Sequence, residues 1–401
     1  MKPPKGYKQT ELGILPDNWK VVKCGEVLRE VSVRNKDDRE TNIISVTNTR
    51  GFTKQNEFFG KIVASKDTTN YKIIHKNQFA YNPARINVGS IALLKDFDIG
   101  ILSPMYVVFE CKHLLSAEYL NHWLKSYFFM GVLEDYLSGS VRKSLNFKDM
   151  EQISIFLPPL KEQEKIAEIL NAADLELSSY EKLIALKEKY KKGLMQKLLT
   201  PKIRFKEFKE QWKVVKCGEV LREVSVRNKD DRETNIISVT NTRGFTKQNE
   251  FFGKIVASKD TTNYKIIHKN QFAYNPARIN VGSIALLKDF DIGILSPMYV
   301  VFECKHLLSA EYLNHWLKSY FFMGVLEDYL SGSVRKSLNF KDMEQISIFL
   351  PPLKEQQKIA EVLSSCDAEI QNLKDLCALL KKQKHALMQR LLCGKVRVKG
   401  T

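Results

Sequence analysis

The chain has 401 residues, of which 44% are hydrophobic and 27% charged; this composition excludes a disordered or fibrous protein and allows two or more cores. Its formal net charge of +17 favours a polyanionic partner, either nucleic acid or an acidic membrane surface, over a merely soluble basic protein. No run approaches the roughly 18 apolar residues of a membrane span, and the first residues lack the apolar region of a signal peptide.

The cysteines show neither CxxC spacing nor a Cys/His cluster, so no zinc site or other metal site is predicted. We expect reduced thiols and a cytoplasmic protein. The cysteines are Cys24, Cys111, Cys217, Cys304, Cys366, Cys377 and Cys393.

A long internal repeat organises the chain. Residues 19–163 (block 1) recur without a single change as residues 212–356 (block 2), offset by 193 positions (212 − 19). A repeat of this length indicates duplicated domains and not a solenoid. The helical pattern that follows each block recurs at the same offset with many substitutions.

Before block 1, residues 6–16 are predicted to be extended and rich in turns. Inside the block, β-branched and aromatic residues gather in short runs between polar turns, which predicts strands. These runs are 43–46, 72–75, 78–81, 90–94, 101–110 and 153–156. Residues 82–89 are predicted to form a loop. Ser116 is a candidate cap for one helix that continues to Phe128 at helical spacing. Each block is therefore predicted to be mixed α and β.

A helix is predicted from Leu160 to Leu199, because apolar residues then recur at alternating steps of four and three, the heptad spacing of coiled coils. At ~1.5 Å per residue it would be about 60 Å long. The first stripe is Ile166, Leu170, Ala173, Leu177, Tyr180 and Ile184, and the second is Ile359, Leu363, Cys366, Ile370, Leu373, Cys377, Leu380, Leu387 and Leu391.

A helix of this length cannot bury its stripe on one small domain, so we expect the two helices to pair. To meet the first helix, the second must return toward block 1, which predicts an antiparallel coiled coil with an approximate two-fold axis. The alternative is burial within a single domain. The predicted boundaries are 1–158 and 201–351 for two globular domains, and 159–200 and 352–401 for the helices.

Signals of catalysis are missing. There is no GxxxxGK[ST] phosphate loop and no GxGxxG after a strand. Asn82-Pro83-Ala84-Arg85 faintly resembles the loop of adenine methyltransferases, but it lacks the second proline and the aromatic residue, so we interpret it as a chance match. His122, on the predicted helix, is interpreted as structural. The acidic pairs at 37–38 and at 96 and 98 are interpreted as solvated turns and not as metal ligands.

Three polar, basic loops in each block have the residue types that contact DNA phosphates and base edges. A solvated loop is the simpler interpretation of any one of them, but three together with the positive charge favour DNA binding. In block 1 the candidates are Thr47, Asn48, Arg50, Lys54, Asn82, Arg85, Ser138, Ser140, Arg142 and Lys143. In block 2 they are Thr240, Asn241, Arg243, Lys247, Asn275, Arg278, Ser331, Ser333, Arg335 and Lys336.

The chain resembles the specificity subunits of type I restriction-modification systems. The resemblance lies in Tyr7-Lys8-Gln9-Thr10-Glu11-Leu12-Gly13 with Pro16 and Trp19, then in Ser138-Gly139-Ser140 with Arg142, Lys143 and Leu145, and in Leu157-Pro158-Pro159-Leu160 with Glu162-Gln163. Block 2 repeats the last two groups at 331–338 and 350–356, so the resemblance covers nearly the whole chain.

The resemblance implies two target-recognition domains, each reading half of a split site in double-stranded DNA. It also implies an antiparallel coiled coil that docks two methyltransferase subunits, with restriction and motor subunits joining for cleavage. This subunit would be non-catalytic and bind no cofactor, and S-adenosylmethionine is expected on the methyltransferase subunit. The alternatives are a stand-alone DNA-binding adaptor for another enzyme and, less favoured, a catalytic nuclease or methyltransferase.

One feature departs from the family pattern, which usually combines two different recognition domains. Here the two are identical. Because identical readers related by a two-fold axis must meet identical half-sites, we predict an interrupted palindrome.

Overall fold

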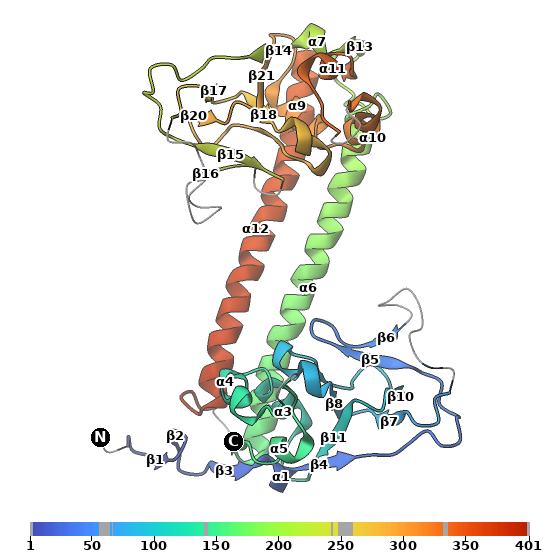
Figure 1. Ribbon diagram of the computed structural model, residues 1–401, viewed down its shortest axis with the longest axis vertical. Helices are drawn as coiled ribbons and strands as arrows, with labels where there is room; N and C mark the ends of the chain where they lie inside the picture. The colour runs from blue at the N-terminus through green and yellow to red at the C-terminus, as the bar shows by residue number, and fades with distance from the viewer. Residues whose placement is uncertain are drawn as a thin grey trace. The chain divides into compact units, whose positions relative to one another are not determined.

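The computed structural model describes residues 3–55, 65, 67–139, 143–241, 244–247, 260–331 and 336–398. The chain divides into two compact units, residues 1–180 with 376–401 (unit 1) and residues 181–375 (unit 2). Block 1 lies in unit 1 and the globular part of block 2 in unit 2 (Figure 1). Each unit also contains part of both long helices, and the two units are described separately below.

Small antiparallel sheets form the scaffold of block 1. The largest has the strand order β4-β11-β8-β9. Its strands are β4 (Leu28–Val31), β8 (Phe79–Tyr81), β9 (Ile91–Leu93) and β11 (Val107–Cys111). Two-stranded sheets pair β3 (Lys20–Lys23) with β12 (Ser154–Leu157), β5 (Ile44–Thr47) with β6 (Gly51–Lys54), and β7 (Lys72–His75) with β10 (Ile99–Leu102). The lead-in forms a hairpin of β1 (Tyr7–Thr10) and β2 (Gly13–Pro16).

Both faces of the four-stranded sheet are covered, because successive strand residues point to opposite sides. Phe79 and Phe109 belong to the main core, on the side of the helices. Ala80 and Val108, each one position along the same strands, belong to a second cluster with the β5–β6 hairpin. The helices of block 1 are α1 (Cys24–Val27), α3 (Ala117–Trp123), α4 (Tyr127–Tyr136) and α5 (Phe147–Met150), with the 3-10 helix η1 (Pro83–Val88).

Block 2 builds the same elements. They are β13 (Lys213–Lys216), α7 (Cys217–Val220), β14 (Leu221–Val224), β15 (Ile237–Thr240), β16 (Gly244–Lys247), β17 (Lys265–His268), β18 (Phe272–Tyr274), η2 (Pro276–Val281), β19 (Ile284–Leu286), β20 (Ile292–Leu295), β21 (Val300–Cys304), α9 (Ala310–Trp316), α10 (Tyr320–Tyr329), α11 (Phe340–Glu344) and β22 (Ser347–Leu350). The prediction of a mixed α and β fold is confirmed in both blocks.

The two long helices are α6 (Leu160–Leu198) and α12 (Leu353–Leu392). Within unit 2 they run antiparallel, because residue numbers fall along α12 as they rise along α6: Lys187 pairs with Glu369 at 2.6 Å, and Lys191 pairs with Asp367. Within unit 1, Lys384 of α12 pairs with Asp174 of α6. The predicted antiparallel pairing is therefore confirmed inside each unit.

The heptad stripe is used in two ways. Ile166 and Leu170, near the start of α6, are fully buried in the main core of block 1, where Met388 and Leu391 from the end of α12 join them. Farther along α6, Leu177 is also buried. The first part of the stripe therefore packs on the globular domain, as the alternative of burial within a single domain predicted. Both interpretations hold, each for different turns of the helix.

Three predicted elements differ from the structure, the first two because a turn or a helix cap interrupts an apolar run. The predicted strand at 101–110 is two strands, β10 and β11, separated by a turn in which the Tyr106 amide donates to the Ser103 carbonyl at 3.0 Å. The predicted single helix at 116–128 is α3 followed by α4, because Ser126 caps a new helix by accepting from the Phe129 amide. The predicted loop at 82–89 contains η1.

The motif residues after Pro159 attach block 1 to α6. Glu162 is buried and accepts a hydrogen bond from the Trp19 indole at 3.0 Å. Gln163 is buried as well; its amide nitrogen donates to the Leu114 and Pro158 carbonyls, and its oxygen accepts from the Ser116 amide at 2.8 Å. These residues are therefore structural, and they fix the start of the long helix on the globular domain.

Candidate nucleic-acid interface

The helix η1 occupies the centre of the candidate interface. Its start is fixed by Asn82, whose side-chain oxygen accepts from the Ala84 amide at 3.1 Å, with Pro83 at the first helical position. Its end is fixed by Gly89, which adopts a φ of 87°, a backbone conformation that glycine enters without strain. Arg85, which lies between the two, is exposed.

The first predicted loop lies against this helix. The Ser90 hydroxyl donates to the Val46 carbonyl at 3.1 Å, which holds the end of η1 beside the β5–β6 turn. In that turn Thr47 is buried, and its hydroxyl donates to the Gly51 carbonyl and accepts from the Arg50 amide. We therefore assign Thr47 to the turn itself, whereas Asn48 and Arg50 are exposed on its surface.

The third predicted loop reaches the other side of η1. The Leu145 amide donates to the Pro83 carbonyl at 3.1 Å, and the loop is closed by reciprocal backbone hydrogen bonds between Ser138 and Ser144. Lys143 is exposed and pairs with Glu134 at 2.8 Å. Ser140 and Arg142 fall outside the described residues. The structure thus brings three segments that are distant in sequence onto one surface, here called the loop face.

Block 2 repeats this arrangement. The Ser283 hydroxyl donates to the Val239 carbonyl at 3.1 Å, and the Leu338 amide donates to the Pro276 carbonyl at 3.1 Å. Thr240 again stabilises its own turn, because its hydroxyl donates to the Gly244 carbonyl. Asn241, Asn275, Arg278, Ser331 and Lys336 occupy the positions of their block 1 counterparts. Arg243, Ser333 and Arg335 lie outside the described residues.

Among the candidates that the structure describes, Lys54 and its copy Lys247 lie away from the loop face. Lys54 pairs with Ile44, at the opposite end of the hairpin from the turn. Its ammonium lies 5.8 Å from the centre of the Phe97 ring, and Lys247 lies 5.9 Å from the ring of Phe290.

Sequence reasoning did not select Met105, which lies on this surface. Met105 is 61% exposed at the β10–β11 turn, and its sulfur lies 3.9 Å from the Asn82 amide nitrogen. The turn formed by residues 103–106 places it there, and Pro104 at the second turn position is the sequence signal that would have revealed it.

No group of three or more His, Cys, Asp or Glu side chains in the described part of the chain is arranged to hold a metal ion. None of the described helices has both the length and the hydropathy that a bilayer span requires. The loop face offers arginine, lysine and amide groups at the surface, which is the chemistry that contacts phosphates and base edges.

Known proteins resemble the chain over nearly its whole length. The MjaVIII type I restriction enzyme specificity subunit of Methanocaldococcus jannaschii is 28% identical, with 96% of this chain and 95% of that protein covered. The putative MjaX specificity subunit of the same organism is 25% identical, with 98% and 97% covered.

Solved structures share the fold. The S subunit of a type I restriction-modification system from M. genitalium matches with a TM-score of 0.58 at 14% identity, covering 98% of this chain and 99% of that one. The HsdS subunit from Thermoanaerobacter tengcongensis matches with a TM-score of 0.50 at 20% identity, covering 95% and 98%. The family model for the type I restriction modification DNA specificity domain matches residues 16–188 and 209–382, so the chain belongs to this family and contains two copies of its domain.

Proposed function

We propose that this chain is the non-catalytic subunit that gives a type I restriction-modification complex its DNA sequence specificity, each block reading one half of a bipartite site in double-stranded DNA. The observation that carries the proposal is the loop face, where Arg85 and Asn48 stand exposed around η1 in block 1 and Arg278 and Asn241 around η2 in block 2. Side chains of these types reach both phosphates and base edges.

Because the two blocks are identical, the two half-sites should be identical and lie on opposite strands. Sequencing that maps methylated adenines in cells carrying the complete system is expected to yield one interrupted palindrome. A map with two unrelated half-sites would contradict this expectation, and a map with no motif that depends on this chain would contradict the proposed function as a whole.

We further propose that the long helices dock two methyltransferase subunits, which bind S-adenosylmethionine, and that restriction and motor subunits join them. Each unit carries the same pair of exposed leucines: Leu183 and Leu186 on α6 in unit 2, and Leu376 and Leu379 on α12 in unit 1. The pairs are related by the repeat offset of 193 positions (376 − 183). Leu186 is 64% exposed and Leu379 is 52% exposed, so neither pair is explained by the core of its unit.

The stoichiometry of the purified complex tests this docking. The wild-type chain is expected to bind two copies of its methyltransferase subunit, and Leu376→Ser with Leu379→Ser should reduce this to one. Leu114→Ser with Leu307→Ser, which are equally exposed at 52% and 53% but belong to the blocks, should leave two. No binding of a methyltransferase subunit by the wild-type chain would favour the stand-alone adaptor, and two bound copies in the helix variant would reject these leucines.

A further inference from the structure

The two identical blocks rest on helix residues that differ. In each unit the contact centres on a buried histidine of the block, His122 of α3 in unit 1 and His315 of α9 in unit 2. The helix residue facing its Nε2 is Asn171 in unit 1 but Ser364 in unit 2. We call this contact the seat of the block. Because the blocks are identical, any difference between the seats arises from the helices.

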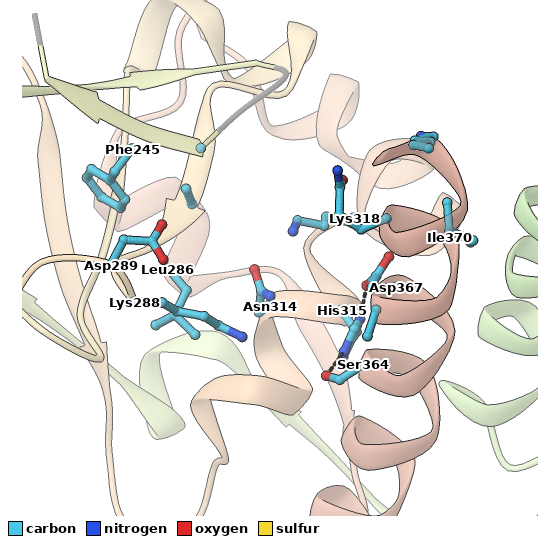
Figure 2. Close-up of a pocket in the computed structure, with 15 residues that line it drawn as sticks. Phe245, Leu286, Lys288, Asp289, Asn314, His315, Lys318, Ser364, Asp367 and Ile370 are labelled. Atoms are coloured by element: carbon cyan, nitrogen blue, oxygen red, sulfur yellow. Dashed lines mark hydrogen bonds and ion pairs between the residues drawn. The ribbon is translucent and has the colours of Figure 1, made fainter. Parts of the chain in front are cut away.

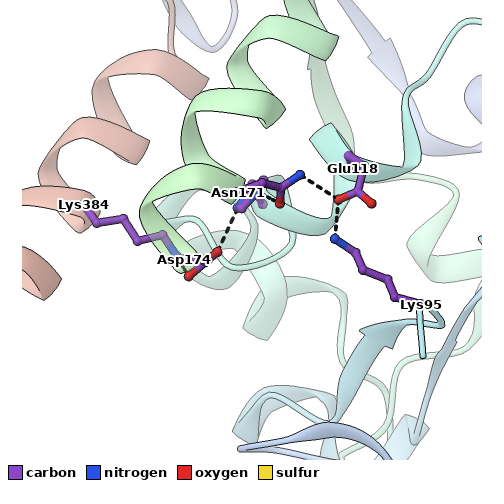
Figure 3. Close-up of polar contacts among 6 residues, drawn as sticks. Lys95, Glu118, Asn171, Asp174 and Lys384 are labelled. Atoms are coloured by element: carbon purple, nitrogen blue, oxygen red, sulfur yellow. Dashed lines mark hydrogen bonds and ion pairs between the residues drawn. The ribbon is translucent and has the colours of Figure 1, made fainter. Parts of the chain in front are cut away.

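In unit 1 the seat is a connected network (Figure 3). Glu118, which forms an ion pair with Lys95, can only accept hydrogen bonds, so the nitrogen of the Asn171 amide faces it, at 3.1 Å. The amide oxygen of Asn171 therefore faces His122 Nε2, at 3.0 Å, and His122 must donate from Nε2. Asn171 thus joins two residues of α3 to α6.

This geometry fixes the tautomer of His122. Burial lowers its pKa to about 4, so the ring is neutral at pH 7 and carries one proton. With that proton on Nε2, Nδ1 presents a lone pair 4.0 Å from a carboxylate oxygen of Asp174 and has no hydrogen-bond partner among the described residues.

In unit 2 the seat is simpler (Figure 2). The Ser364 hydroxyl lies 3.0 Å from His315 Nε2, and a hydroxyl can donate as well as accept. Within the described residues Ser364 has no other hydrogen-bond partner, so Glu311 is not connected to α12 as Glu118 is to α6. His315 Nδ1 lies 3.9 Å from a carboxylate oxygen of Asp367. A proton on Nδ1 faces this negative charge favourably, and Nε2 then accepts from Ser364.

Burial lowers the pKa of His315 to about 4 as well, so it too is neutral. Beside it an open cleft of about 1060 Å³ separates residues of β16 and β19 from α12; Phe245 and Leu286 lie on the block side, and Ile370 lies on the helix side (Figure 2). Block 2 is therefore attached to α12 beside an open cleft.

A second contact differs in the same direction. In unit 1 the Tyr127 ring packs edge-on against His385 of α12 with centroids 4.9 Å apart, and its amide donates to the Gln389 side chain at 3.3 Å. In unit 2 the position of His385 is taken by Lys192, and Tyr320 has no ring partner in the described part of the chain, although Tyr127 and Tyr320 are almost equally exposed, at 68% and 69%. Tyr320 and Lys192 line a hollow of about 480 Å³ instead.

We propose that Asn171 and Ser364 are positioning residues that hold two identical recognition blocks differently: block 1 is fixed by a network, and block 2 is attached through a single side-chain hydrogen bond at its seat. His122 and His315 then carry their protons on opposite ring nitrogens, Nε2 and Nδ1. The consequence for DNA rests on the proposed function: block 1 is held in its reading orientation, whereas block 2 occupies that orientation for a smaller fraction of the time.

Nitrogen-15 NMR of the full chain with labelled histidine tests the seats without DNA, because the protonated and unprotonated ring nitrogens have distinct shifts. His122→Gln and His315→Gln assign the signals. We expect His122 protonated at Nε2 and His315 at Nδ1. Ser364→Asn should move the proton of His315 to Nε2, and Asn171→Ser should move that of His122 to Nδ1. The same tautomer at both histidines of the wild type, or no change in the exchanged variants, overturns the proposal.

A matched pair of variants tests the consequence for DNA. Ser364→Asn with Lys192→His gives unit 2 the two helix side chains that hold block 1, and Asn171→Ser makes the opposite exchange in unit 1. If block 2 is in its reading orientation about a third of the time, Ser364→Asn with Lys192→His should tighten binding to a palindromic site by up to roughly threefold, because the apparent Kd is the intrinsic Kd divided by the populated fraction.

Asn171→Ser should weaken binding, because block 1 then occupies its reading orientation for a smaller fraction of the time. Unchanged affinity in both exchanged variants would reject the functional consequence. Absence of sequence-specific binding by the wild-type chain in its methyltransferase complex would instead reject the proposed function, and the NMR result would still decide whether the seats differ.

Discussion

Replacing Arg85 and Arg278 together by alanine is expected to weaken binding of the methyltransferase complex to its palindromic site roughly 30-fold, on the order of 1 kcal/mol for each lost contact. Both arginines project from the short helix at the centre of the loop face. Each has an exposed side chain with no ion pair inside the described residues. A free guanidinium on such a surface gives up no internal partner when it meets DNA.

The salt dependence of binding separates phosphate contacts from base contacts in this variant. If both arginines contact phosphates, the slope of log K against log salt concentration should become shallower by about 1.8, because each phosphate contact contributes about 0.9. If they contact base edges, affinity should fall with a smaller change in slope, and discrimination against altered half-sites should fall as well.

Arg29→Ala with Arg222→Ala is the matched control. These arginines are also identical copies, they are 69% and 68% exposed, and they are paired with Glu110 and Glu303 away from the loop face. The control removes the same number of charges, so it corrects for the loss of overall positive charge. Equal binding curves for the two double variants would show that the loop-face arginines contribute no more to DNA binding than the control arginines do. That result would reject this surface as the interface.

The repeat, the mixed fold and the long helices were predictable because each depends on a local or periodic pattern. The assembly of the loop face was not. It depends on hydrogen bonds from Ser90 to Val46, 44 positions apart, and from Leu145 to Pro83, which no spacing in the sequence indicates. The polar composition of the loops indicated which segments to consider, but it did not separate Thr47, which closes its own turn, from Asn48, which is exposed.

The errors within the predicted elements have a common physical cause. Residues 101–110 and 116–128 are both apolar enough to continue as one element, so hydrophobicity alone joined them. Pro104 and Ser126 broke them, the first by favouring a turn and the second by capping a new helix. The seats were beyond prediction for another reason: identical blocks give identical patterns, and only the packed helices reveal that Asn171 and Ser364 face equivalent histidines.

Loss of the buried carboxylate of Glu162 is expected to destabilise unit 1 by about 3 kcal/mol, a large part of the stability of an ordinary domain. Glu162 is 1% exposed and receives the Trp19 indole hydrogen bond together with two from Arg397, at 2.7 and 3.0 Å. In Glu162→Ala the fully buried indole nitrogen of Trp19 loses its acceptor and Arg397 loses its partner.

Unit 2 contains the same arrangement of a buried glutamate bound by a tryptophan and an arginine, here called the clamp, built from a different part of the chain. Glu355 accepts from Trp212 at 2.8 Å and from Arg204 at 3.1 and 2.7 Å. Arg204 follows α6, whereas Arg397 follows α12, and the two arginines are again 193 positions apart (397 − 204). In unit 1 the clamp therefore joins the segment after α12, which contains Arg397, to Trp19 near the start of block 1. In unit 2 the corresponding segment, which contains Arg204, is already joined to Trp212 by the continuous chain.

Denaturant unfolding followed by tryptophan fluorescence checks this expectation, because each unit has its own tryptophans, Trp19 and Trp123 in unit 1 and Trp212 and Trp316 in unit 2. Glu162→Ala should move one of two unfolding transitions to lower denaturant concentration and leave the other in place, and Glu355→Ala should do the reverse.

Glu162→Gln keeps an acceptor for the indole and should lose less stability. Glu164→Ala, an exposed neighbour on the same helix, should change stability by no more than about 0.5 kcal/mol. An unchanged midpoint in Glu162→Ala would mean that solvent replaces the clamp, and that burial of the carboxylate does not hold the end of α12 on block 1.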